Sequence, residues 1–314
     1  MQPDVRHLAR LRSTGGMHAG SWLSVFPMAF WSTARGRHYQ LALCARLGVA
    51  VPEFARTQGM PVMCKCGVQH DAYGFHPGVC RRGNRMSLWT VRHDALERML
   101  VLIIRRLGYA GQSCSTGAGN WFGSAGWSTS GKGYRRADVV LPHFYGPGRH
   151  LFLDTAVTDP TAGAALTARP SSAISSGVAA EQRAAKKVAK YGHLAASVSS
   201  QFRPAVALAE RFGTCCDALT GFISTLCGTG DRDPLRHDDY TFSASSRSTY
   251  MSSLLVFSVV IADACMLDRV IDCDARDAPL QRFPARRQLP GSDPTPVLQR
   301  DIEGIGGQFW YEAP

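Results

Sequence analysis

The sequence predicts an α/β fold in its central part. Two apolar segments with strand character, 137–144 and 150–158, are separated by a Gly-Pro-Gly turn that suits a hairpin. A third apolar segment, 202–210, follows a helical pattern at 178–198. Hydrophobic residues make up 45% of the 314 residues and charged residues only 19%, so most of the chain should be globular with a buried hydrophobic core.

The remaining elements are predicted from helical periodicity and from turn residues. In chain order we expect helices at 18–27, 36–49, 91–109, 216–227 and 250–267, with a Gly/Ser-rich stretch at 110–134. These elements divide the chain into a helical lead at 1–60, a cysteine-rich knuckle at 61–90, an α/β domain at 91–272 and a loosely ordered tail at 273–314.

The formal charge of +11 favours a polyanionic partner, either nucleic acid or an acidic membrane face. No signal peptide is evident, and the apolar run at 250–267 is interrupted by serines and Asp263, so we expect a buried helix and no membrane span. We therefore expect an intracellular protein in a reducing compartment. There, clustered cysteines favour a metal over a disulfide.

The segment CKCGVQHDAYGFHPGVC at 64–80 carries the clearest metal-binding pattern. Cys64, Cys66, His76 and Cys80 provide the thiolates and imidazole that a tetrahedral zinc ion prefers. Four protein ligands leave no position for water, so such a zinc ion is structural. The spacing between the first two cysteines is shorter than usual, and His70 and Asp71 are possible substitute ligands. The alternative is a glycine-rich loop with unliganded thiols.

Acidic and basic side chains also gather on the predicted strands and on the helix after them. Asp138 and Asp154 lie on adjacent strands, where two carboxylates can share one Mg²⁺ ion. Lys187 and Lys190 share a face of the 178–198 helix and can add positive charge there. Each group also has an ordinary structural alternative: an ion pair with a neighbouring arginine, a turn carboxylate, or a solvated helix face.

The order of these motifs resembles the C-terminal region of non-LTR retrotransposon polyproteins. The motifs are CxCG…GxHxxxC, RHD, R-x-ADV, DxAV, KxxKY and FxP, with WLSVFP and RLG upstream, and they cover about residues 10–270 in pieces. The resemblance implies a zinc knuckle followed by a restriction-like endonuclease of the PD-(D/E)XK type, with a mixed sheet flanked by helices. It also implies Mg²⁺-dependent nicking of double-stranded DNA, which frees a 3′-hydroxyl for reverse transcription.

The resemblance assigns roles to particular residues. Asp138 and Asp154 take the places of the two strand acids that bind Mg²⁺, and the lysine that usually follows the second acid is replaced by Ala156. The retrotransposon variety carries that lysine on the next helix, as Lys187 or Lys190. The basic residues expected to contact nucleic acid are Arg81, Arg82, Arg85, Arg135, Arg136 and Lys186.

One departure from the family pattern concerns an upstream acid. Related chains carry a glutamate before R-x-AD, whereas residues 109–134 contain no Asp or Glu, which leaves Glu97 on the preceding helix as the nearest candidate. Loss of a ligand would weaken Mg²⁺ binding. The alternatives to an active nuclease are therefore a non-catalytic DNA-binding module and an inactive element remnant.

The reverse transcriptase itself is not expected in this chain. The Asp-Asp pair at 238–239 lies in a polar segment, and the space before residue 60 is too short for a palm domain. We expect a fragment derived from a mobile element, nuclear if functional, that binds DNA and, as a further candidate, the element's RNA. The sequence gives no indication of its oligomeric state.

Overall fold

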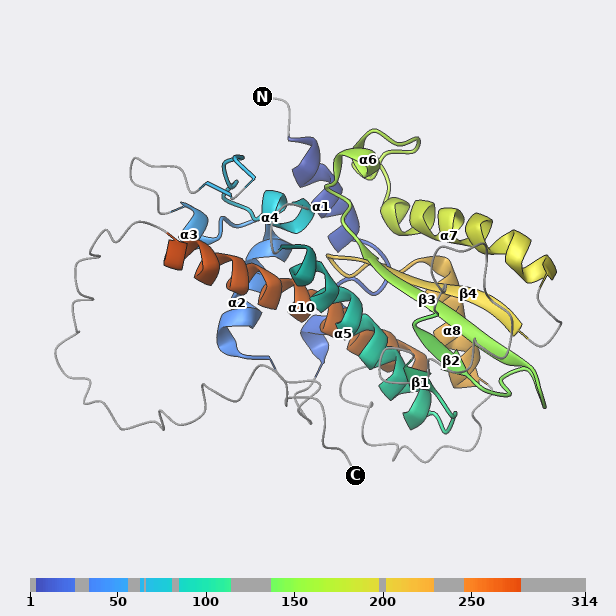
Figure 1. The fold of residues 1–314 in the computed structure, drawn as a ribbon. Coiled ribbons are helices and arrows are strands. Elements are labelled where there is room, and N and C mark those ends of the chain that lie inside the picture. Colours follow the sequence, from blue (N-terminus) through green and yellow to red (C-terminus); the bar gives the residue numbers. More distant parts are fainter. Residues whose placement is uncertain are drawn as a thin grey trace, which may run out of the picture. The chain divides into compact units, whose positions relative to one another are not determined.

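The computed structural model of this chain describes residues 4–25, 34–55, 63–64, 66–80, 85–113, 137–197, 202–228 and 246–277. The chain divides into two compact units, Met1–Ala275 and Arg276–Pro314. The first unit is an α/β structure with a mixed sheet flanked by helices and a Cys₃His cluster (Figure 1).

The sheet has four strands within the described residues, in the spatial order β1 (Gln112–Ser113), β2 (Val139–Leu141), β3 (His150–Thr158) and β4 (Phe202–Glu210). Strands β1, β2 and β3 form an antiparallel series, and β4 runs parallel to β3. The predicted strands at 150–158 and 202–210 are confirmed over their full lengths. Among the described strands β4 lies at the edge of the sheet, where Pro204 is tolerated.

The predicted strand at 137–144 is too long. Strand β2 ends at Leu141, and the chain then turns through residues 142–148 with His143 at a φ of 58°. Pro142 cannot donate a backbone hydrogen bond to a neighbouring strand, which explains the early end. The hairpin connection itself is confirmed. Strand β1 was not predicted, because two residues are too few to show a pattern.

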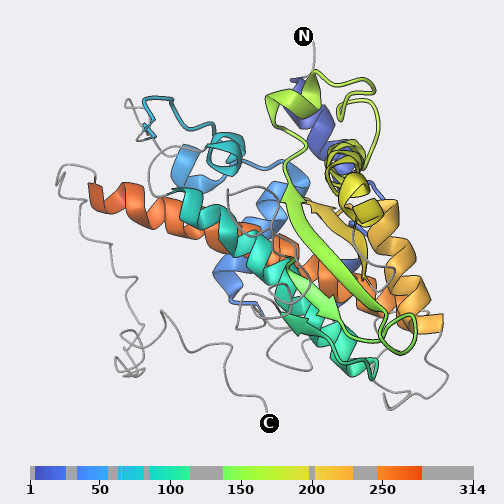
Figure 2. The same ribbon diagram turned by 45° about the vertical axis from the view of Figure 1, so that its right-hand side comes forward.

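Two helices cover opposite sides of the sheet. Helix α5 (Arg85–Arg106) lies on one side and α7 (Val178–Ser197) on the other (Figures 1 and 2). Helix α5 begins six residues before the predicted start at 91, and the chain leaves the helical conformation at Gly108, where φ is 82°. Helix α7 makes the crossover that two parallel strands require.

The remaining helices are α1 (Val5–Thr14), η1 (Ser21–Ser24), α2 (Gly36–Leu47), α3 (Pro52–Ala55), α4 (Phe75–Val79), α6 (Gly163–Leu166), α8 (Asp217–Gly228) and α10 (Arg247–Asp277). Helices α2 and α8 lie close to their predicted positions, and α10 extends beyond the predicted 250–267 at both ends. Helices α1, α3, α4 and α6 were not predicted individually. The predicted helix at 18–27 is wrong: its described part forms only the short 3₁₀ helix η1. The tail predicted from 273 begins later, because α10 continues to Asp277, and residues 278–314 lie outside the described residues.

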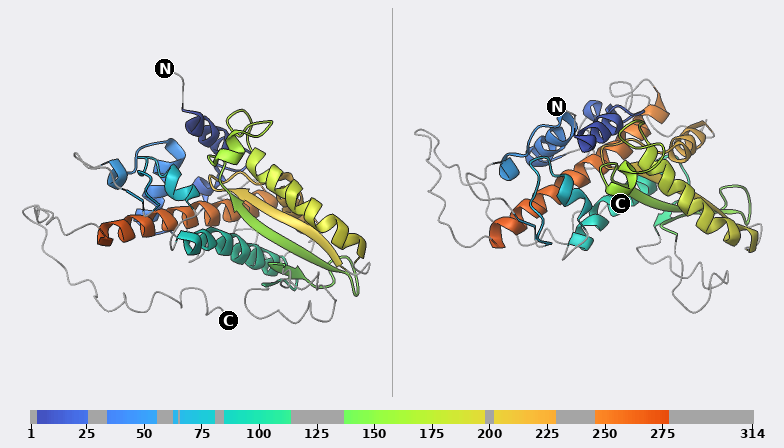
Figure 3. Two further views of the ribbon diagram at one scale, coloured as in Figure 1. Left: turned by 45° about the horizontal axis from the view of Figure 1, so that its top comes forward. Right: turned by 90° about the horizontal axis from the view of Figure 1, so that it is seen from above.

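The hydrophobic core has two clusters. The larger one joins the sheet to α5, α8 and the first half of α10. The smaller one packs Trp22, Leu41 and Phe54 of the lead against Val256 and Phe257 of α10. Figure 3 shows the helices of the lead beside the long helix α10. The lead and the sheet therefore share α10, which explains why residues up to Ala275 form one unit.

A buried network of charges also ties the first unit together. The guanidinium of Arg211, just after β4, donates to Asp159 Oδ2 at 2.9 Å and to Asp263 Oδ2 of α10 at 2.9 Å. Arg92 of α5 donates to the other oxygen of Asp263 at 3.0 Å and to the carbonyl of Gly78 at 3.0 Å. Burial lowers the pKa of Arg211, but the two carboxylates outweigh it and raise that pKa.

Candidate metal centres

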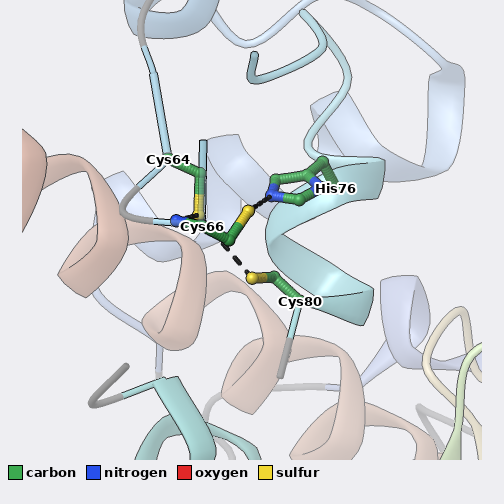
Figure 4. A group of neighbouring side chains, drawn as sticks. All are labelled: Cys64, Cys66, His76 and Cys80. Carbon is green, nitrogen blue, oxygen red and sulfur yellow. Dashed lines mark hydrogen bonds between the residues drawn. The ribbon is translucent and has the colours of Figure 1, made fainter. Parts of the chain in front are cut away.

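The cysteine-rich segment brings its four predicted zinc ligands together. The ligand atoms of Cys64, Cys66, His76 and Cys80 all lie within 4.8 Å of one another (Figure 4). Cys64 Sγ is 3.6 Å from Cys80 Sγ, and Cys66 Sγ is 3.2 Å from His76 Nε2. The Cys64 and Cys80 side chains are buried, whereas those of Cys66 and His76 are partly exposed.

Local hydrogen bonds position these ligands. Gly67, at a φ of 84°, turns the chain so that its amide donates to the carbonyl of Cys64 at 2.8 Å. Asp71 accepts hydrogen bonds from the backbone amides of Tyr73, Phe75 and His76, which sets the start of α4. The carboxylate of Asp71 therefore supports the backbone and is not a member of the four-residue group.

His70, the other possible substitute, has a different position. Its ring is buried and stacks on Phe54 with the ring centroids 5.2 Å apart. It also contacts the ring of His76 edge-on, with centroids 5.4 Å apart. His70 thus packs behind the ligand group and supports His76. The short spacing of Cys64 and Cys66 does not prevent all four ligands from meeting.

This Cys₃His group can bind a metal such as zinc. Three thiolates and one imidazole match the ligands of structural zinc sites, and their mutual distances suit a single tetrahedral ion. Such an ion would link the loop before α4 to both ends of that short helix.

We expect the purified protein to contain about one zinc ion per chain, because structural sites of this kind bind zinc tightly. Replacing Cys80 with serine removes a buried ligand and should reduce the zinc content to near zero, as measured by atomic emission. Replacing Cys44 of α2 with serine is the matched control and should leave the zinc content unchanged. Equal zinc contents in the Cys80→Ser variant and the wild type would rule out this site.

A second polar cluster lies where β2 begins beside β3. The Oδ2 atom of Asp138 accepts hydrogen bonds from the Thr155 backbone amide at 2.6 Å and from the Thr155 hydroxyl at 3.0 Å. Its Oδ1 atom lies 3.5 Å from His93 Nε2 of α5. The first predicted strand acid is therefore fixed against β3 and faces α5.

His93 joins this acid to Glu97, one turn further along α5. His93 Nε2 is 3.8 Å from Glu97 Oε2, and Ser113 of β1 donates to the other oxygen of Glu97. His93, Asp94 and Glu97 also form a group of ligand atoms within 4.8 Å of one another. Sequence reasoning did not assign a role to His93, although its i, i+4 spacing to Glu97 on a predicted helix is a usable signal.

The charges in this cluster shift the pKa values of its members. A hydrogen bond with Asp138 raises the pKa of His93 above its ordinary value, and the charges of Asp138 and Glu97 add to this effect, while burial opposes it. Burial alone would raise the pKa of Asp138, but the interactions with His93 and Thr155 outweigh it and lower that pKa. Asp138 is therefore ionised at neutral pH.

The second predicted strand acid meets the predicted lysine. Lys187 of α7 donates from Nζ to Asp154 Oδ1, and also to the carbonyl oxygen of Thr155 at 2.9 Å. Both side chains are mostly buried, with 11% of Lys187 and 15% of Asp154 exposed. Lys190 and Lys186, on the same helix, are exposed. Of the three lysines, the structure places Lys187 at the strand.

The two predicted acids face different helices. Successive side chains of a strand point to opposite faces, so Asp154 and Thr155 lie on opposite faces of β3. Asp154 contacts Lys187 of α7, whereas the Thr155 hydroxyl lies 3.3 Å from His93 Nδ1 of α5. Asp138 belongs with Thr155 and His93. A Mg²⁺ ion shared by Asp138 and Asp154 stays a prediction. The backbone of Thr155 contacts both clusters, because its amide donates to Asp138 and its carbonyl accepts from Lys187.

Most of the predicted phosphate-contacting residues lie outside the described residues. These are Arg81, Arg82, Arg135 and Arg136. Arg85 is the first residue of α5, and Lys186 is exposed on α7. The basic edge beside the cysteine-rich segment therefore stays a prediction.

The helices of the first unit are too short or too polar to cross a bilayer, as far as the described residues extend. Comparison of the chain with models of known protein families gave no match, and comparison with curated proteins gave no match either.

Proposed function

We propose that this chain is a divalent-metal-dependent DNA endonuclease that nicks one strand, derived from a non-LTR retrotransposon. One observation supports this most strongly. Three residues that the resemblance marks as catalytic meet one short segment of β3 from its two faces: Asp138 accepts from the Thr155 amide, and Lys187 donates to the Thr155 carbonyl and to Asp154 beside it.

The architecture supports a restriction-like PD-(D/E)XK core. The mixed sheet with helices on both faces agrees with what that fold requires, and the lysine lies on the helix after β3, as in the retrotransposon variety. Glu97 is close to the first acid through His93, so it can take the role of the acid that is missing from 109–134.

The side chains present suit a divalent cation beside β3. Asp138 and Glu97 would hold it, because Asp138 Oδ1 lies 3.5 Å and Glu97 Oε2 lies 3.8 Å from the same atom, His93 Nε2. When bound, such an ion supplies Lewis acidity and positive charge for phosphodiester hydrolysis. Asp154 was predicted as a second ligand, and its contact with Lys187 suggests that it chiefly orients that lysine.

The protein groups can account for the remaining requirements of hydrolysis. The ammonium of Lys187, which contacts β3 from the α7 side, would add positive charge for the phosphoryl oxygens from across the strand, opposite the ion on the α5 side. Water supplies the new oxygen on phosphorus, the bond to the 3′ oxygen breaks, and that oxygen takes a proton to become a 3′-hydroxyl beside a 5′-phosphate. The formal charge of +11 would hold the DNA backbone against this region.

A second candidate function is a non-catalytic DNA-binding module, or an inactive remnant with the same fold. The contact between Lys187 and Asp154 favours it, because a carboxylate neutralised by an ammonium is a weaker metal ligand. Such a module would keep the charge-dependent affinity for DNA and the Cys₃His group, but it would not cleave.

Nicking of a supercoiled plasmid separates these functions. We expect the zinc-loaded wild type to convert the plasmid to open circles in the presence of Mg²⁺ or Mn²⁺, and Asp154→Ala to lose this activity. DNA affinity in a gel shift should fall steeply with salt for both proteins. Tight binding without nicking by either protein would establish the non-catalytic module, and binding that does not respond to salt would contradict both functions.

A further inference from the structure

His93 lies at the centre of the polar cluster on the α5 side of β3. Its Nε2 atom is 3.5 Å from Asp138 Oδ1 and 3.8 Å from Glu97 Oε2. We propose that His93 Nε2 is a direct ligand, with Asp138 and Glu97, of one divalent transition-metal ion of the manganese class. This site deepens the proposed nuclease function, on which its role in a reaction rests.

The hydrogen bonds around His93 select the form of the ring that can bind a metal. Its Nδ1 lies 3.3 Å from the Thr155 hydroxyl, and that hydroxyl lies 3.0 Å from Asp138 Oδ2. If the hydroxyl donates to the carboxylate, it accepts from Nδ1–H. With this proton on Nδ1, the ring keeps its support when a metal ion takes the place of the Nε2 proton that otherwise faces the two carboxylates. Metal-binding histidines use their second nitrogen in this way.

Each carboxylate is oriented by a hydroxyl group in the same manner. Thr155 binds Oδ2 of Asp138, and Ser113 donates to Oε1 of Glu97. In both cases the second oxygen of the carboxylate faces His93 Nε2. Hydrogen bonds of this kind orient the side chains that bind a metal ion directly. Of the three candidate ligands, Asp138 thus comes from the residue before β2, and His93 and Glu97 come from one turn of α5.

The distances also fit one ion. Ligands bound at about 2.0–2.2 Å to a common metal lie roughly 3–3.6 Å apart. The distances from Nε2 to the two oxygens, 3.5 Å to Asp138 and 3.8 Å to Glu97, lie close to this range. Asp94 forms a group of ligand atoms with His93 and Glu97, and its Oδ2 also lies 3.9 Å from Arg98 Nη2.

The imidazole determines which metal the site prefers. Mg²⁺ binds through oxygen, whereas imidazole nitrogen suits transition ions. One nitrogen with two carboxylates is therefore expected to favour Mn²⁺ over Mg²⁺. The Cys₃His group is a separate site with soft sulfur ligands, so zinc loading of that group leaves the α5 site for the harder ion.

The test uses Mn²⁺ itself as the probe. The zinc-loaded full chain is mixed with up to one equivalent of Mn²⁺, and pulsed electron paramagnetic resonance detects nitrogen bound directly to the ion. We expect a ¹⁴N coupling in the wild type, which changes to ¹⁵N when the protein is made with ¹⁵N-histidine. This labelling identifies a histidine ligand without any mutation.

Two variants then identify the histidine. His93→Gln should lose the nitrogen coupling, bind Mn²⁺ about tenfold or more weakly, and lose most of its preference for Mn²⁺ over Mg²⁺. His38→Gln is the matched control, because His38 Nε2 lies 3.2 Å from a single carboxylate, that of Asp268. It should behave as the wild type. Circular dichroism establishes that both variants are folded.

Three results would overturn the site: no binding of Mn²⁺ to the wild type, bound Mn²⁺ without a nitrogen coupling, or a coupling that persists in His93→Gln. Nicking assays on the same samples keep this inference distinct from the proposed function. A His93-dependent nitrogen coupling without nicking would support the site and contradict the nuclease. Mg²⁺-dependent nicking without any nitrogen coupling would do the reverse.

Discussion

Replacing Lys187 with methionine is expected to lower the rate of plasmid nicking by about 100-fold or more, the usual effect of removing one charged group that stabilises a transition state. Methionine keeps most of the side-chain volume but removes the ammonium that contacts Asp154 and the Thr155 carbonyl. The rate is measured under single-turnover conditions with saturating divalent cation, so that a change in metal affinity does not affect the result.

Lys190 provides the matched control for this experiment. It lies three residues further along α7, and its side chain is exposed. Lys190→Met removes the same charge from the same helix, and we expect it to change the nicking rate by less than about threefold at low salt, through weaker attraction of DNA. A larger loss in Lys190→Met than in Lys187→Met would transfer the catalytic role to Lys190.

Replacing Arg211 with methionine is expected to destabilise the protein by about 3–5 kcal/mol, because it removes the arginine that pairs with buried Asp159 and leaves buried Asp263 with Arg92 alone. The side chain of Arg211 is 0% exposed, and those of Asp159 and Asp263 are 4% exposed. The free energy of unfolding is measured by urea denaturation of the zinc-loaded protein at neutral pH.

Arg37 is the control for Arg211. It also pairs with two carboxylates, those of Glu53 and Asp268, but all three side chains are partly exposed. We expect Arg37→Met to cost less than about 1 kcal/mol. If the two variants lost equal stability, the buried network would not be the main link between β4, α10 and the rest of the unit.

The same network explains a sequence feature of the cysteine-rich segment. A Cβ atom at Gly78 would lie 1.8 Å from Arg211 Nη1 and 2.7 Å from Asp159 Oδ2. Only glycine therefore fits between His76 and Cys80 at this point. The carbonyl of Gly78 also accepts a hydrogen bond from Arg92. The Cys₃His group is thus anchored to the sheet region through buried arginines, and a zinc ion there would stabilise that contact.

Local patterns were sufficient to predict several parts of the structure. The limits of β3 and β4 could be predicted because their apolar runs end before Asp159 and before Arg211. The four ligands of the Cys₃His group could be predicted because cysteine and histidine at such short spacing have few other uses. From the sequence, the choice of the lysine that contacts the strand could be limited to Lys187 or Lys190. Only the orientation of α7 against β3 shows that this lysine is Lys187.

Other features depend on contacts between distant residues. His93 gains its significance from Asp138 and Thr155, which lie 45 and 62 residues further along the chain. The partners of Arg211 are each 52 residues away, in opposite directions. No periodicity or spacing indicates such contacts. The two faces of β3 likewise became distinguishable only when the positions of α5 and α7 were known.

The most direct test of the cation site is the anomalous diffraction of Mn²⁺ in crystals of the zinc-loaded protein. We expect one manganese peak within bonding distance of Asp138 Oδ1, His93 Nε2 and Glu97 Oε2, on the α5 side of β3, with Lys187 still in contact with Asp154. A manganese peak bound to Asp154 in place of Lys187, or no peak near Asp138, would contradict it.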